Sequence, residues 1–111
     1  MNLHDLAHQL ARAIRQSSEY KGMLAAKDDI KDNPAAQEMI KDFHQKQFAV
    51  QAAQLSGEDV PADKIKQLNS LYEILAANPG VRTYLEAEYN LSRLLADIQK
   101  IISEAVEPAL E

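Results

Sequence analysis

His4 and His8 are the two side chains whose type and spacing come nearest to a metal site. Residues four apart share one face of a helix, and two imidazoles placed this way can hold one divalent ion. A zinc site normally needs a third or fourth ligand, and the sequence contains no HExxH motif. His44 is the only other histidine. His4 and His8 are therefore the metal candidates, but the pattern favours two exposed histidines near a chain end, and we expect no resident cofactor.

Glu86 and Glu88 come nearest to a pair of catalytic carboxylates. Residues two apart on a helix do not face each other, so these two cannot act as a pair within one chain. Glu88 falls on an apolar helix face, where a partner across an interface would help to fix register. The sequence also lacks the GxGxxG, Walker A and GxSxG patterns. We expect a protein that is not an enzyme, although residues distant in sequence can still meet in space.

The composition indicates one helical domain. The chain has 111 residues, of which 46% are hydrophobic and only three are glycine, so an all-β fold with many tight turns is disfavoured. No cysteine is present, which excludes disulfides, thiolate metal sites and cysteine nucleophiles. The N-terminus has no signal-peptide pattern, and no stretch approaches the roughly 18 apolar residues of a membrane span. We expect a soluble, cytoplasmic protein.

The charge balance argues against direct nucleic-acid binding. The 17 acidic residues outnumber the 12 Lys and Arg, and the basic residues are scattered along the chain. Nucleic-acid binders usually concentrate positive charge on one face. An adaptor role in RNA binding stays open as an alternative, and it predicts binding that depends strongly on salt.

Two Asn-Pro pairs, Asn33-Pro34 and Asn78-Pro79, punctuate the helical pattern. The Asn side-chain oxygen can accept a bond from a free N–H of the first helical turn. Proline at the first helical position gives up an N–H that has no partner there, and it pushes the preceding residue out of the α region. Each pair therefore predicts the end of one helix and the start of the next.

Other boundaries follow from local composition. The two serines at 17 and 18 interrupt an apolar stripe and predict a break, Gly57 fits a helix C-cap, and Pro61 fits a helix start. The polar loop after Gly57 predicts an antiparallel hairpin. The expected architecture is one all-α domain over 1–111, with N-terminal helices over 1–32 and a break near Ser17-Ser18, hairpin helices over 34–56 and 61–77, and a long C-terminal helix over 79–107.

The long C-terminal helix carries a heptad-like apolar seam. At ~1.5 Å per residue it would extend roughly 43 Å, beyond the ~13 Å radius of gyration of a compact domain of this size. A monomer would expose the overhanging apolar residues, so we expect a dimer or higher homo-oligomer with a shared helical core. The residues predicted to form this oligomer interface are Tyr84, Glu88, Leu91, Leu95, Ile98 and Ile102.

The order of these features resembles the YheA, YmcA and YlbF family of small helical bacterial proteins, and the YheA branch in particular. The resemblance covers nearly the whole chain and rests on the order and spacing of landmarks rather than on a chemical motif. These landmarks are Ser18-Glu19, Phe43, Gln47, Gly57, Pro61, Asn78-Pro79 and Ala87-Glu88.

The resemblance implies an oligomeric all-α protein of the bacterial cytoplasm, from Firmicutes. In the family, YmcA and YlbF are non-enzymatic regulatory subunits that act with YaaT in competence, sporulation, biofilm formation and mRNA processing by ribonuclease Y. Their complex holds Fe–S clusters through cysteines, and this chain has none, so the cluster function does not carry over. The resemblance favours an interaction protein with partners of the YmcA, YlbF and YaaT type. The alternative is a small-molecule or metal-binding protein with a site between subunits.

Overall fold

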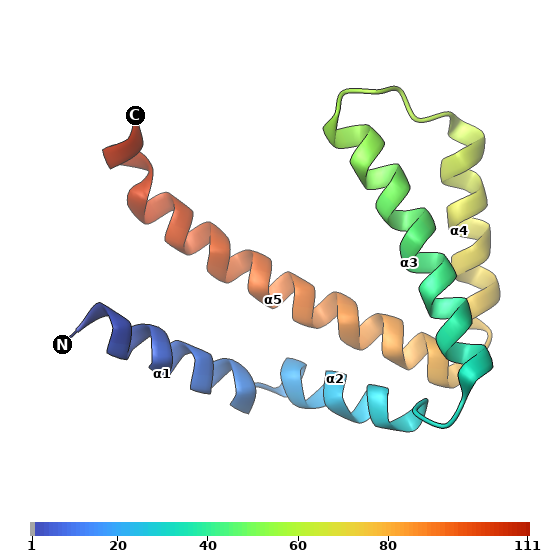
Figure 1. Cartoon of the computed structure of the whole chain (residues 1–111), viewed down its shortest axis with the longest axis horizontal. Helices are drawn as coiled ribbons and strands as arrows, with labels where there is room; N and C mark the ends of the chain where they lie inside the picture. Colours follow the sequence, from blue (N-terminus) through green and yellow to red (C-terminus); the bar gives the residue numbers. More distant parts are fainter. Residues whose placement is uncertain (1) are drawn as a thin grey trace. The chain divides into compact units, whose positions relative to one another are not determined.

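The chain is all-α, which confirms the predicted fold class. The computed structural model describes residues 2–111, which form five helices and, within that range, no strand (Figure 1). Each helix begins and ends at a punctuation residue or a short turn. The helices are α1 (Leu3–Gln16), α2 (Ser18–Asp29), α3 (Pro34–Leu55), α4 (Ala62–Ala76) and α5 (Pro79–Leu110).

The helices form two compact units. The hairpin unit is Asp28–Thr83, and it contains α3, α4 and the first residues of α5. The terminal unit combines the chain up to Lys27 with Tyr84–Glu111, so it holds α1, most of α2 and the greater part of α5. Residues from both ends of the sequence therefore belong to one unit.

The hairpin unit contains most of the buried apolar residues. Helices α3 and α4 lie side by side and run in opposite directions (Figure 1). Phe43 on α3 packs against Tyr72 on α4, with ring centroids 5.9 Å apart, an arrangement that aromatic pairs favour. The buried residues gather where the hairpin meets the start of α5, and they are Ile30, Ala36, Ile40, Phe43, Leu75 and Val81.

Both Asn-Pro pairs occupy helix starts. Asn33 Oδ1 accepts a hydrogen bond from the Ala36 N–H at 3.1 Å, and Pro34 is the first residue of α3. Asn78 Oδ1 accepts bonds from the Gly80 and Val81 N–H groups at 3.0 and 3.3 Å, and Pro79 opens α5. Each Asn thereby satisfies N–H groups that a helix start leaves without a partner.

The end of α3 is closed by a glycine with a positive φ. Gly57 has φ 79°, and its N–H donates to the Gln54 carbonyl at 3.2 Å. The Glu58 N–H donates to the Ala53 carbonyl at 3.0 Å, which completes a Schellman motif. The following loop leads to Pro61, which is the N-cap of α4 without a side-chain cap bond. Helix α4 thus begins one residue after the predicted start, because ψ of Pro61 is extended at 138°.

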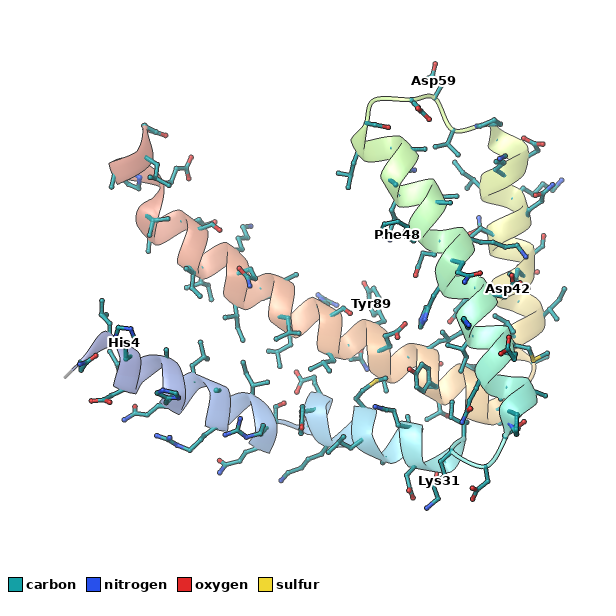
Figure 2. The ribbon with its side chains drawn as sticks, in the orientation of Figure 1. His4, Lys31, Asp42, Phe48, Asp59 and Tyr89 are labelled. Carbon is teal, nitrogen blue, oxygen red and sulfur yellow. The ribbon has the colours of Figure 1, made fainter. Side chains whose placement is uncertain are left out.

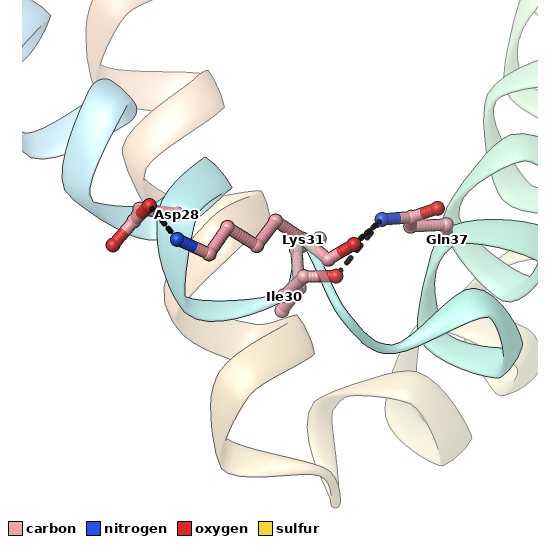
Figure 3. A network of polar contacts seen from close by, with 4 residues as sticks. All are labelled: Asp28, Ile30, Lys31 and Gln37. Atoms are coloured by element: carbon pink, nitrogen blue, oxygen red, sulfur yellow. Dashed lines mark hydrogen bonds and ion pairs between the residues drawn. The ribbon is translucent and has the colours of Figure 1, made fainter.

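The turn between α2 and α3 is held by Gln37. Its Nε2 donates to the carbonyls of Ile30 at 2.9 Å and Lys31 at 3.0 Å (Figure 3). These bonds satisfy two carbonyls that follow the end of α2. The neighbouring Asp28–Lys31 ion pair, at 3.0 Å, is exposed and contributes little to stability.

Ser17 separates α1 from α2. Its backbone is extended, with φ −69° and ψ 152°, and its Oγ donates to the Ile14 carbonyl. The same Oγ accepts a bond from the Tyr20 N–H at 3.1 Å, so one hydroxyl serves the end of α1 and the start of α2.

Helix α5 is the longest element, with 32 residues. At ~1.5 Å per residue it extends roughly 48 Å. It continues through Pro108 to Leu110, three residues past the predicted end at Glu107. Pro108 lies in the last turn, where it removes one backbone donor, and the helix continues for two more residues.

Candidate interaction faces

Helix α1 has a one-sided apolar stripe that its own chain does not bury. Leu3, Leu6 and Leu10 recur at helical spacing, yet α1 contains no buried residue. Leu3 is 80% exposed. The polar residues, including Arg12 and Arg15, lie on the other side of the helix. A helix this amphipathic is normally stabilised by packing its apolar side, so the stripe is a candidate interaction surface.

The apolar seam of α5 becomes more exposed towards the end of the chain. Leu85 is 6% exposed, whereas Leu110 is 81% exposed. Among the six residues predicted to form the oligomer interface, Tyr84, Glu88, Leu91 and Ile98 are half-buried, while Leu95 and Ile102 are exposed. The exposed apolar residues of α1 and of the second half of α5 are together called the terminal stripes. They are Leu3, Leu6, Leu10, Leu95, Ile101, Ile102, Val106 and Leu110.

Four charged residues in the second half of α5 lie away from its apolar seam. Arg93, Asp97, Lys100 and Glu104 recur at spacings of three and four with alternating sign, on the side opposite Ile102. The Lys100 Nζ lies 3.9 Å from the Glu104 carboxylate, and both side chains are exposed. The second half of α5 therefore has a solvated charged side and a separate apolar side, as in helices of a bundle.

Tyr84 and Glu88 lie one turn apart on α5. Burial, and secondly the negative charge of Glu88, raise the pKa of the Tyr84 phenol above its ordinary value of 10.0. The phenol therefore stays neutral at physiological pH. Both residues belong to the terminal unit.

A second exposed apolar stripe lies on α3. Phe48 is 72% exposed and Leu55 is 89% exposed, and their spacing of seven residues places them on one side of the helix. Figure 2 shows Phe48 on the side of α3 that faces away from α4. This stripe is smaller than the terminal stripes because it contains only two large apolar residues.

A cleft of about 320 Å³ opens between α3, the following loop and α4. Its apolar wall includes Val50, Val60 and Leu68, and its rim carries Lys64 and Asp59. The volume lies at the lower end of the range of small-molecule sites, about 300–1,000 Å³. The sequence analysis missed this cleft. The available signal was the pair Ala49 and Ala53, whose small side chains line the cleft and leave space there.

His4 and His8 are both exposed on α1 (Figure 2 labels His4). Asn2 caps this helix by accepting a bond from the His4 backbone N–H at 2.7 Å. Within residues 2–111, no group of three or more His, Cys, Asp or Glu side chains is placed to hold a metal ion. In the same part of the chain, no helix is both long enough and apolar enough to span a membrane.

Comparisons with known proteins agree on one family. A family model described as "Control of competence regulator ComK, YlbF/YmcA" (Com_YlbF) matches residues 3–107. A UPF0342 protein of Symbiobacterium thermophilum is 45% identical over 105 residues, which cover 95% of this chain and 94% of that protein. A UPF0342 protein of Desulfitobacterium hafniense is 43% identical over 106 residues, covering 96% and 86% of the two chains.

The fold has a counterpart among solved structures. A "Protein of Unknown Function (DUF964)" from Bacillus stearothermophilus superposes with a TM-score of 0.75. It is 26% identical in sequence, and the match covers 95% of this chain and 92% of that one. The similarity therefore extends over both compact units rather than over a single helical segment.

Proposed function

The chain belongs to the Com_YlbF family, and from that premise we propose that it is a non-enzymatic regulatory subunit of the bacterial cytoplasm that binds other helical proteins. The observation that carries this proposal is the apolar side of α1, which has regular helical spacing but no buried residue. Exposed apolar patches rimmed by polar residues mark interaction sites. The terminal stripes are the surface through which such a subunit would bind its partners.

The family description supplies the biological setting of the proposal. The matched model concerns control of a competence regulator. We place this chain beside regulatory subunits of the YmcA, YlbF and YaaT type, which are linked to competence, sporulation, biofilm formation and ribonuclease Y-dependent mRNA processing. The missing cysteines mean that it would act in such an assembly without ligating an Fe–S cluster.

Co-purification from the native host under gentle conditions, read by quantitative mass spectrometry, tests this function. The bait is the tagged full-length chain, and an untagged strain is the control. We expect enrichment of YmcA-, YlbF- or YaaT-like proteins or of ribonuclease Y. Each enriched protein is then purified and mixed with the bait to show direct binding. The capture is repeated at several salt concentrations. If none of these proteins is enriched at any of them, the proposed regulatory role is contradicted.

The cleft between α3 and α4 favours a second candidate function, the binding of a small molecule. Its wall is mainly apolar, and no ion pair joins Lys64 on its rim to another of the described residues. A small apolar molecule with an acidic group suits this combination of wall and rim. The matched variants are Ala53→Trp, which fills the cleft, and Ala52→Trp, which lies outside it. Ligand-observed NMR with medium-chain carboxylic acids should show binding that only Ala53→Trp abolishes. Equal signals from both variants would exclude this site.

A further inference from the structure

We propose that the cleft between α3, the following loop and α4 binds a free amino acid with a branched aliphatic side chain, such as leucine. This inference rests on the second candidate function, the binding of a small molecule in this cleft, and deepens it by naming the class of ligand. Every residue that lines the cleft belongs to the hairpin unit. One compact unit of a single chain therefore supplies both the apolar wall and the charged rim.

The wall of the cleft is aliphatic. Helix α3 contributes Ala49, Val50 and Ala53, which share one side of the helix. The loop adds Val60, and α4 adds Leu68. None of the lining residues, all of which lie in the described part of the chain, is aromatic. A branched aliphatic side chain gains dispersion contacts with such a wall, whereas an aromatic ligand would find no ring to pack against.

The size of the cleft favours a single amino acid over a peptide. Its volume of about 320 Å³ lies at the lower end of the range of small-molecule sites, about 300–1,000 Å³. Val50, Val60 and Leu68 are only half-buried, so part of each side chain is available to an apolar ligand. A longer chain would extend beyond this wall into solvent, where it gains no further apolar burial.

The rim of the cleft carries charges of both signs. Lys46 is already paired, because its Nζ lies 2.7 Å from the Asp42 carboxylate. Within residues 2–111, no ion pair involves Lys64, Glu58 or Asp59. The rim therefore has one free ammonium group and two free carboxylates. A simple carboxylic acid would satisfy Lys64 but would add a negative charge beside the two carboxylates, which like-charge repulsion disfavours.

An α-amino acid complements this rim because its ammonium and carboxylate groups share one carbon atom. Lys64 lies in the first turn of α4, and Glu58 and Asp59 lie in the loop that leads into it (Figure 2 labels Asp59). Charges of both signs therefore gather at the loop end of the cleft. The ligand carboxylate would bind Lys64 and its ammonium group the loop carboxylates, while its side chain extends along Val50 and Leu68.

Amide-resolved NMR titration of the full-length chain tests this assignment with three ligands of one carbon skeleton. Leucine carries both charged groups, isocaproate lacks the ammonium group, and isopentylamine lacks the carboxylate. We expect leucine to bind roughly three- to fivefold more tightly than either analogue, because each analogue leaves one rim contact unmade. The amide signals of Val60 and Lys64 should shift with leucine concentration, which places the ligand in the cleft.

Charge-removing variants identify the two rim contacts. Lys64→Gln should remove the preference for leucine over isopentylamine, whereas Lys66→Gln, outside the cleft, should keep it. Glu58→Gln combined with Asp59→Asn should remove the preference for leucine over isocaproate. Asp63→Asn, also outside the cleft, is the matched control and should keep that preference. All five side chains are exposed, so the variants should retain the wild-type helix content seen by circular dichroism.

The outcomes separate the ligand class from small-molecule binding itself. If isocaproate binds as tightly as leucine, and Ala53→Trp abolishes its binding, the cleft binds small molecules but the amino-acid assignment is overturned. The assignment is also overturned if Lys64→Gln and Lys66→Gln show the same ligand preference. If none of the three ligands binds, or if Ala53→Trp and Ala52→Trp bind them equally, both the assignment and the second candidate function are contradicted.

Discussion

Phe43 on α3 and Tyr72 on α4 pack their rings 5.9 Å apart at an angle of 48°, and this contact joins the two arms of the hairpin. Phe43 is buried, whereas Phe48 on the same helix is 72% exposed. Phe43→Ala should lower the free energy of unfolding by about 3–5 kcal/mol, because it leaves a cavity in the core. Phe48→Ala should change it by less than about 0.5 kcal/mol. Urea unfolding of both variants checks the assignment, and similar losses would show that the hairpin core lies elsewhere.

Substitution by alanine should lower the free energy of unfolding at Gly57 and raise it at Gly22. An added Cβ meets no atom within 4 Å at either site, so the backbone decides the effect. Gly57 has φ 79°, and an alanine there should cost about 1–2 kcal/mol. Gly22 lies within α2, and an alanine there should add about 0.5–1 kcal/mol. Thermal unfolding of the two variants measures both changes in stability. If Gly57→Ala and Gly22→Ala change stability in the same direction, the Schellman motif after α3 is contradicted.

Tyr84 should make stability fall at alkaline pH. Burial and the charge of Glu88 raise the pKa of its phenol in the folded state above 10.0. As the pH rises through the unfolded value, the unfolded chain loses the proton first, so the stability contribution is complete below that value and is lost above it. Tyr84→Phe should reduce the fall in the free energy of unfolding above pH 10, whereas Tyr89→Phe, at an exposed position, should not. Chemical unfolding as a function of pH measures this, and identical profiles for the two variants would refute it.

Local chemistry made much of the fold predictable. The all-α class follows from composition and helical periodicity, and it is confirmed by the structure and by the solved structure of similar fold. Asn33 and Asn78 cap helices through hydrogen bonds that any helix start requires, so the Asn-Pro dipeptide alone predicts their role. Gly57 closes α3 because only glycine adopts its φ without strain. The family prediction is confirmed as well.

Features that depend on packing between residues distant in the sequence cannot be predicted from local sequence patterns. The exposure of Leu3 and Leu110, and the burial of Leu85, depend on which helices meet in space, which periodicity does not specify. The cleft beside Leu68 is lined by residues of α3, the following loop and α4, which come together only in the folded chain. The predicted end of α5 at Glu107 treats Pro108 as a stop, whereas the helix runs to Leu110. The oligomer interface around Ile98 and the roles of His4 and His8 stay predictions.

The most direct test of the central claim is quantitative capture from the native host with three baits: wild type, Leu6→Asp and Arg12→Asp. If the apolar side of α1 binds partners, wild type and Arg12→Asp should enrich the same regulatory proteins of the YmcA, YlbF or YaaT type. Leu6→Asp should lose them, and the purified components should reproduce this difference. Equal enrichment by all three baits, or enrichment of none of these proteins, would contradict the claim that this chain acts through its uncovered helix faces.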